Sequence, residues 1–356
     1  NLGNALSMMG QREPSTAPLK EAVDAYRKAI ETFSREAVPL DWAMAQNNLG
    51  NALSQLGIRE MVKDQFESAI SAYRSALEIY TRDNAPLDWA LTQTNLGDSL
   101  QALGAHEDKM EYVREAVDAC RAALTVLTRD NDLFKWGSVK NNLGTALLTL
   151  GERENNKHLI MDAADAYKAA LHSNTRDKTP LLWATSKNNL GNALMLLGRL
   201  DRNTSQLEES IRAFQAALEE RTRSRMPLAW AATQNNLGLA QYNLGKLEGG
   251  SRRLKEALSS FKSSLEEATC ERVPLEWSKT QNNIGNTLYL LALREESLPL
   301  LKEALAALRK AQNVDVSLAQ LGHLSAYYNA RIAETEELIA KIEGLTPTSY
   351  SNSKIG

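Results

Sequence analysis

The stretch Trp42–Gly57, WAMAQNNLGNALSQLG, returns in closely similar form along most of this 356-residue chain. Every tryptophan stands on its register, one every 47 residues: Trp42, Trp89, Trp136, Trp183, Trp230 and Trp277. A glycine column keeps the same step: Gly3, Gly50, Gly97, Gly144, Gly191, Gly238 and Gly285. A fixed period of this length indicates a solenoid, in which each repeat packs only against its neighbours.

Each repeat is predicted to contain two helices. The first begins near Pro39, because proline is tolerated in the first turn of a helix, and Gly57 is expected to end it before a polar loop. The second has an apolar face around Tyr73 and is expected to close at Thr81 and Arg82, where a cation meets the negative helix end. No segment alternates with period two over a useful length, so the predicted fold class is all-α.

Two features are expected to join successive repeats. Trp42 lies on the same helix stripe as Leu49 and Leu53, which predicts a tryptophan buried at the junction between repeats. The pair Arg59-Glu60 recurs after the second glycine of other repeats and is expected to link neighbouring repeats through paired loop charges.

Composition excludes several classes of protein. A formal net charge of −3 argues against a nucleic-acid or anionic membrane surface, and no apolar run approaches the roughly 20 residues that cross a bilayer. Cys120 and Cys270 make no disulfide framework, which favours a reducing, cytoplasmic location. The four histidines pair with no cysteine or carboxylate at metal-ligand spacing. We therefore expect no enzyme, metal or cofactor.

Some of these residues resemble a known family. Leu96-Gly97, then Leu100, Ala116 and an apolar residue four further on, resemble the skeleton of tetratricopeptide repeats. The usual repeat of about 34 residues is lengthened here, and the family's tryptophan position is Gln93. Longer repeats of this kind are similar to those of kinesin light chains and of bacterial tetratricopeptide arrays. The resemblance implies a right-handed α-solenoid of about seven helix-turn-helix repeats, with the first helices on the concave side.

The repeat register also predicts the domain organisation. The array is expected to span residues 1–312, with a truncated first repeat, because Asn1-Leu2-Gly3 aligns with Asn48-Leu49-Gly50 and upstream residues are missing. Residues 313–345 are predicted to form a C-terminal capping helix, read as one long charged helix from about Ser317 to Leu345. Residues 346–356 are predicted to be a disordered tail.

Two polar columns lie on the first helices, away from the stripe that contacts the second helix. One is invariant: Asn1, Asn48, Asn95, Asn142, Asn189, Asn236 and Asn283. The other, three residues on, varies: Asn4, Asn51, Asp98, Thr145, Asn192, Leu239 and Asn286. The resemblance implies that both face the groove. The predicted peptide-binding residues are Asn48, Asn51, Asn95, Asp98, Asn142, Thr145, Asn189, Asn192, Asn236, Tyr242, Asn283, Asn286 and Tyr289.

Asparagine amides suit two roles, which the sequence leaves open. Each amide offers donors and an acceptor, so a row of them can pair with the backbone of an extended peptide. The resemblance to kinesin light chains and bacterial peptide-sensing receptors implies this use. Alternatively, Asn48 bonds to Asn47, to Thr94 of the next repeat or to a backbone carbonyl, and the row simply holds repeats in register.

The predicted function is a non-enzymatic protein interaction module that holds a partner peptide or protein segment in its groove, with no nucleic-acid or membrane partner. Self-association through the open first repeat is a further expectation. The rival prediction is a structural or sensor arm of a larger signalling protein, such as one with a nucleotide-binding or protease-like domain. In that case the asparagine row is purely structural.

Overall fold

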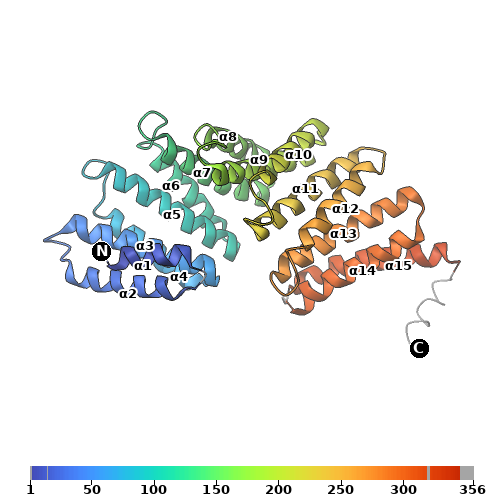
Figure 1. Ribbon diagram of the computed structural model, residues 1–356, viewed down its shortest axis with the longest axis horizontal. Helices are drawn as coiled ribbons and strands as arrows, with labels where there is room; N and C mark the ends of the chain where they lie inside the picture. The colour runs from blue at the N-terminus through green and yellow to red at the C-terminus, as the bar shows by residue number, and fades with distance from the viewer. Residues whose placement is uncertain (1, 14, 319–320, 345–356) are drawn as a thin grey trace. The chain divides into compact units, whose positions relative to one another are not determined.

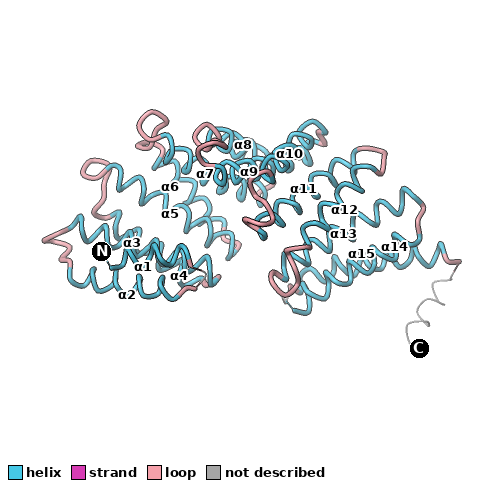
Figure 2. Tube along the Cα trace, viewed as in Figure 1, coloured by secondary structure: helices cyan, strands magenta, loops and turns pink. Residues whose placement is uncertain are grey.

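The computed structural model describes residues 2–13, 15–318 and 321–344. Within these ranges the chain is helical and contains no strand (Figure 2). None of the helices described is both long and apolar enough to cross a membrane. The chain divides into two compact units, residues 1–178 (unit 1) and residues 179–356 (unit 2).

Unit 1 is a succession of helix pairs (Figure 1). Its helices are α1 (Leu2–Arg12), α2 (Ala17–Thr32), α3 (Pro39–Glu60), α4 (Lys63–Leu77), α5 (Pro86–Glu107), α6 (Met110–Ala123), α7 (Leu133–Arg153) and α8 (Lys157–Ala170). Odd-numbered helices are the first helices of the repeats, and even-numbered helices are the second. Each contacts its own partner and the next helix along the chain. The predicted all-α repeat of two helices is confirmed.

Unit 2 continues the same pattern and adds a different end. Its helix pairs are α9 (Pro180–Asp201) with α10 (Thr204–Leu218), α11 (Pro227–Leu247) with α12 (Arg252–Leu265), and α13 (Pro274–Glu295) with α14 (Leu298–Gln312). They are followed by a π-helix η1 (Asn313–Leu318), a short 3₁₀ turn η2 (Gly322–Leu324) and α15 (Ser325–Ile342). The handedness of the array remains a prediction.

Gly57 does not end its helix, contrary to the sequence analysis. α3 runs on to Glu60, and the break falls at Met61, whose backbone is left-handed with φ 53°. Gly57 instead makes room, because a Cβ atom there would lie 3.0 Å from the ring of Phe66 on α4. Glycine in this column serves helix-to-helix packing rather than a turn.

The other glycine column is still more tightly packed. A Cβ on Gly50 would lie 2.5 Å from the ring of Tyr73, a side chain that is only 1% exposed. Gly191 stands in the same relation to Phe214 of unit 2, at 2.7 Å. Because protein interiors are close-packed, the long first helix can approach the second only where it lacks a side chain.

The second helices end earlier than predicted. α4 stops at Leu77, so Thr81 and Arg82 lie in the connection to the next repeat. Arg82 places its guanidinium 5.6 Å from the ring centre of Trp89, a cation–π distance. Trp89 is half-buried, as are the other tryptophans, so the predicted burial is only partial. One face of the Trp89 indole ring packs on the protein, and the other lies beneath the guanidinium of Arg82.

The Arg-Glu pairs join neighbouring repeats through side-chain charges, as Glu60 does with Lys20 at 2.7 Å, and also through the backbone. Arg59 of α3 reaches the preceding repeat, where its guanidinium donates to the carbonyl oxygens of Gly10 at 2.6 Å and Glu13 at 2.8 Å. Arg294 of α13 makes the matching bond to the carbonyl of Gly245, at 2.7 Å. These carbonyls lie at helix C-terminal ends, where they have no partner within the helix. Each arginine therefore caps the first helix of the repeat before it.

The C-terminal segment differs from the single long helix predicted over residues 317–345. The α-helix α15 covers only Ser325–Ile342, and η1 and η2 precede it. Asp315, which is 4% exposed, accepts hydrogen bonds from Ser278 and Tyr328, and this buried contact fixes the bend before α15. The predicted tail, residues 346–356, lies outside the described residues.

Candidate functional site

The asparagine columns lie on the predicted face of the first helices. In α3, Leu49 and Leu53 are buried at 8% and 3% exposure, whereas Asn48 and Asn51 are half-buried. Asn1 lies outside the described residues. The polar face of α3 is thus distinct from the face packed on α4.

A cavity of about 640 Å³ opens on this face in unit 1, between α1, α3 and α5. It brings together four of the predicted residues: Asn48, Asn51, Asn95 and Asp98. Sequence reasoning missed its apolar wall, formed by Met8 and Ile58, whose side chains are 57% and 59% exposed. The available signal was spacing, since Ile58 follows Asn51 by two helical turns and therefore lies on the same face.

Tyrosines of the second helices fix the outer amides of this cavity. The hydroxyl of Tyr26 donates to Oδ1 of Asn4 at 2.7 Å, and that of Tyr73 donates to Oδ1 of Asn51 at 2.8 Å. Burial raises the pKa of both tyrosines, so each hydroxyl stays protonated at neutral pH and can donate. With its oxygen engaged, the amide of Asn51 keeps its NH₂ group for a partner in the cavity.

The first asparagine of each adjacent Asn-Asn pair, such as Asn47-Asn48, joins successive repeats. Oδ1 of Asn47 accepts from the hydroxyl of Thr92 and from Nδ2 of Asn95, both at 3.2 Å. Asn95 belongs to the invariant column and lines the cavity; its NH₂ group donates between repeats, and its carbonyl oxygen accepts no hydrogen bond from the described residues. The alternative role, an asparagine ladder that holds repeats in register, thus applies to the NH₂ group of Asn95 but not to its carbonyl oxygen.

The same ladder recurs in unit 2. Asn188 accepts from Asn236 at 3.3 Å, and Asn235 accepts from Asn283 at 3.0 Å. In unit 1 it is interrupted where Thr94 replaces the first asparagine, because the Thr94 hydroxyl bonds to its own helix at the Ala90 carbonyl, at 2.8 Å. The ladder therefore forms where both asparagines of the Asn-Asn pair are present.

The two remaining candidates of unit 1 lie on α7, outside the lining of the large cavity. Asn142 and Thr145 are half-buried. The hydroxyl of Tyr167 donates to that of Thr145 at 3.2 Å, as Tyr73 does to Asn51. α7 thus repeats the tyrosine contact without contributing to the cavity.

Candidates of unit 2 on α9 and α11 lie in a less polar setting. Asn189, Asn192, Asn236 and Tyr242 are all half-buried. Phe214, in the position of Tyr73, has no hydroxyl to hold the Asn192 amide. The Tyr242 ring lies under the ammonium of Lys246 at 5.6 Å.

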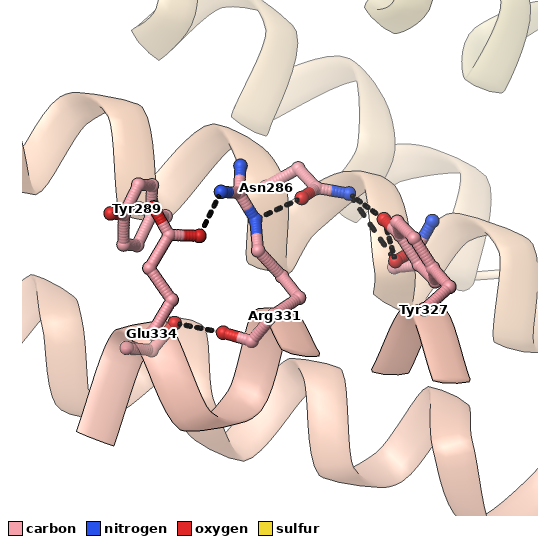
Figure 3. A network of polar contacts seen from close by, with 7 residues as sticks. Asn286, Tyr289, Tyr327, Arg331 and Glu334 are labelled. Atoms are coloured by element: carbon pink, nitrogen blue, oxygen red, sulfur yellow. Dashed lines mark hydrogen bonds and ion pairs between the residues drawn. The ribbon is translucent and has the colours of Figure 1, made fainter. Parts of the chain in front are cut away.

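The last candidates, on α13, are covered by α15. Asn283 engages the ladder, and Asn286 accepts from Nε of Arg331 at 3.0 Å and donates to the hydroxyl of Tyr327 at 2.9 Å (Figure 3). Tyr289 was predicted to face a partner, yet it is only 8% exposed and donates to Glu334 at 2.8 Å. The structure thus replaces an open surface here with contacts to the chain's own helix.

Chemistry-bearing groups elsewhere are sparse in the part of the chain that the structure describes. No cluster of three or more His, Cys, Asp or Glu side chains there could hold a metal ion. Burial raises the pKa of Cys120, which keeps it a protonated thiol in the core.

Comparison with known proteins identifies the repeat. A tetratricopeptide repeat family model matches residues 89–124, 183–222 and 277–311. Each match begins at a tryptophan of the 47-residue register, at every second repeat. No similar sequence is found among curated proteins.

Several solved structures are similar in fold. A Rap protein complexed with competence and sporulation factor has a TM-score of 0.50 at 13% identity, over 94% of this chain and 84% of its own. The apo form of RapI has a TM-score of 0.46 at 15% identity, over the same shares of the two chains. The C-terminal part of a repeat-containing protein from Cytophaga hutchinsonii has a TM-score of 0.46 at 13% identity, over 88% of this chain and 95% of its own. The three matched segments of this chain are tetratricopeptide repeats.

Proposed function

We propose that this repeat protein is an interaction module and that the cavity of unit 1 holds an extended segment of a partner protein. The observation that carries the proposal is the arrangement of Asn51 and Asn95 around one cavity of about 640 Å³. One amide has its oxygen engaged by Tyr73, and the other has its NH₂ group engaged by Asn47. The cavity therefore presents a donor and an acceptor.

A donor and an acceptor on one wall suit a peptide backbone. An extended chain exposes both N–H and C=O groups, and amide side chains can satisfy them without reading the peptide's side chains. Selectivity then comes from the rest of the wall. Burial raises the pKa of Asp98 to about 7, so a cation in the cavity would stabilise its ionised form, while Met8 and Ile58 favour an apolar side chain. The preferred ligand is an extended segment that combines basic and apolar residues.

A protein of similar fold lends support from outside the chain. The Rap structure is that of a complex with competence and sporulation factor. For the present chain, we propose binding of the same general kind, in which the protein holds a segment of a partner.

The test uses an array of unstructured peptides, followed by titration of the best binders against variants. Asn51→Ala removes the donor, and we expect the dissociation constant to rise about tenfold, since a lost hydrogen bond and an exposed polar partner cost roughly 1–2 kcal/mol. Asn192→Ala is the matched control, because it changes the same column in unit 2, where Phe214 replaces the tyrosine. Equal effects of the two variants, or none, would reject the cavity of unit 1 as the site.

The rival function, a structural arm, is favoured by the ladder from Asn47 to Asn95. The same titration separates the two functions. A structural arm captures no peptide from the array, and Asn51→Ala then alters nothing that can be measured by binding.

A further inference from the structure

One column includes side chains that fill junctions between successive first helices. Its members stand 47 residues apart, where the chain leaves each second helix: Phe33, Tyr80, Leu127, Asn174, Arg221, Ala268 and Asp315. Tyr80 is 6% exposed, and its hydroxyl donates to the Leu40 carbonyl at 3.3 Å. Leu127 is fully buried. A large side chain in this column is part of the packing between repeats.

Arg221 shows in unit 2 how that space is occupied. Its guanidinium donates to the hydroxyl of Thr185 on α9 at 3.0 Å and to that of Thr233 on α11 at 3.1 Å. Burial lowers the pKa of Arg221, in line with its place between the two helices. The side chain therefore spans the junction from one first helix to the next.

The following repeat leaves the same space empty. Ala268 takes the place of Arg221, and the counterparts of Thr185 and Thr233 are Ala232 on α11 and Thr280 on α13. A cavity of about 260 Å³ lies there, lined by Ala232, Ala268 and Thr280 among others. Its opening is on the first-helix face, where Ala232 and Lys279 are exposed.

The exposed surface inside this cavity is mainly apolar, and Glu276 and Lys279, whose charged groups lie 3.9 Å apart, also stand in its lining. Val273 and Leu228 line it, and Leu228 is the counterpart of Leu40, which receives the Tyr80 hydroxyl. The Thr280 hydroxyl bonds to the Glu276 carbonyl at 2.8 Å and to Asn235 at 3.3 Å. Because Glu276 and Lys279 carry opposite charges, the lining as a whole favours neither a cation nor an anion.

We propose that this cavity between α11 and α13 is an anchor pocket that takes one aromatic side chain of a protein partner. The occupant is defined by the chain itself, because Tyr80 and Phe33 place rings in the same column of other repeats. The size agrees, since about 260 Å³ is below the range of pockets for whole small ligands but holds a single ring. The proposal rests on the proposed function in that the ring belongs to a protein partner.

The first experiment probes the pocket without a peptide. p-Cresol, the tyrosine side-chain analogue, is titrated into the protein while the amide NMR signals of Ala232 and Thr280 are followed. We expect saturable shifts in the wild type and none in Ala268→Phe, which fills the space from within. Unchanged p-cresol binding in Ala268→Phe, or equal binding of cyclohexanol, would overturn the aromatic pocket.

Opening the preceding junction gives a reciprocal test. Arg221→Ala removes the side chain between α9 and α11, and we expect a second p-cresol site with shifts at Thr185 and Thr233. An Arg221→Ala protein that stays folded by circular dichroism and shows no second site would contradict the argument from the column.

Peptides from the array then test the partner. We expect Ala268→Phe, and alanine in place of the peptide's aromatic residue, each to weaken binding about tenfold or more, as for a lost anchor residue. Together the two changes should have little more effect than either one. Additive losses would overturn the assignment of that residue to the pocket. Failure of the proposed function is distinguishable, because p-cresol would still bind while no peptide was captured.

Discussion

Units 1 and 2 use one fold with different rings beneath the polar columns. In unit 1 three of the four second helices carry tyrosines whose hydroxyls reach the variable column: Tyr26 to Asn4, Tyr73 to Asn51 and Tyr167 to Thr145. In unit 2 the corresponding residues are Phe214, Phe261 and Leu308, which have no hydroxyl. The tyrosine oxygen therefore orients the amides of Asn4 and Asn51, whereas Phe214 offers no such contact to Asn192. The polar cavity of about 640 Å³ is in unit 1, and the mainly apolar pocket of about 260 Å³ is in unit 2 beside more polar ones.

The largest expected effect tests what the two units share. Tyr73→Ala and Phe214→Ala each remove a ring that is 1% or less exposed and packed on a glycine. We expect each to lower the free energy of unfolding by about 3–5 kcal/mol, measured by urea denaturation. Phe134→Ala, at an exposed ring, should change it by less than about 0.5 kcal/mol. A loss for Tyr73→Ala as small as for Phe134→Ala would refute the packing argument.

A smaller effect is expected from the ladder that both units contain. Asn47→Ala and Asn235→Ala each remove two hydrogen bonds between repeats, so we expect a loss of about 1–2 kcal/mol in each unit. The urea midpoint measures the loss, and Asn47→Ala should leave the donor of Asn51 to peptides intact. Thr94→Ala is the control, because the Thr94 hydroxyl bonds only within its own helix. A ladder variant with wild-type stability but lost peptide binding would reverse the assignment of roles.

The smallest expected effects come from exchanging tyrosine and phenylalanine between the two units. Tyr73→Phe removes the hydroxyl that holds Asn51, and we expect a loss of about 0.5–1.5 kcal/mol. Phe214→Tyr adds a hydroxyl beneath Asn192, and a gain of up to about 1 kcal/mol is expected. Both are read from urea midpoints at neutral pH, with the helical circular dichroism signal as the control for folding. Midpoints that shift in the same direction would show that the tyrosine contact is incidental.

Much of this architecture could be predicted from the repeat period. The 47-residue register indicated the helix pairs, and helical spacing placed Asn48 and Asn51 on one face away from Leu49. The role of Gly57 could not be predicted from the period. A glycine that makes room for the Phe66 ring looks the same in the sequence as one that ends a helix.

The details of the candidate site depended on contacts between repeats. Whether Asn47 or Asn48 meets the next repeat depends on the rotation from one repeat to the next, which the spacing of residues does not specify. Tyr289 fits its column, and only the position of α15 shows that it is covered. The space left at Ala268 can be recognised only from the structure, which shows that Arg221 fills the equivalent space in the preceding repeat.

The arginine contacts give the array a direction. Arg59 completes the end of α1, and Arg294 completes the end of α11, so each donor belongs to the later repeat and each acceptor to the earlier one. At these two junctions, losing the later repeat strips α1 or α11 of its cap, whereas losing the earlier repeat leaves the end of the later helix intact. Hydrogen exchange would record this as lower protection at the ends of α1 and α11 when Arg59 or Arg294 is replaced by alanine.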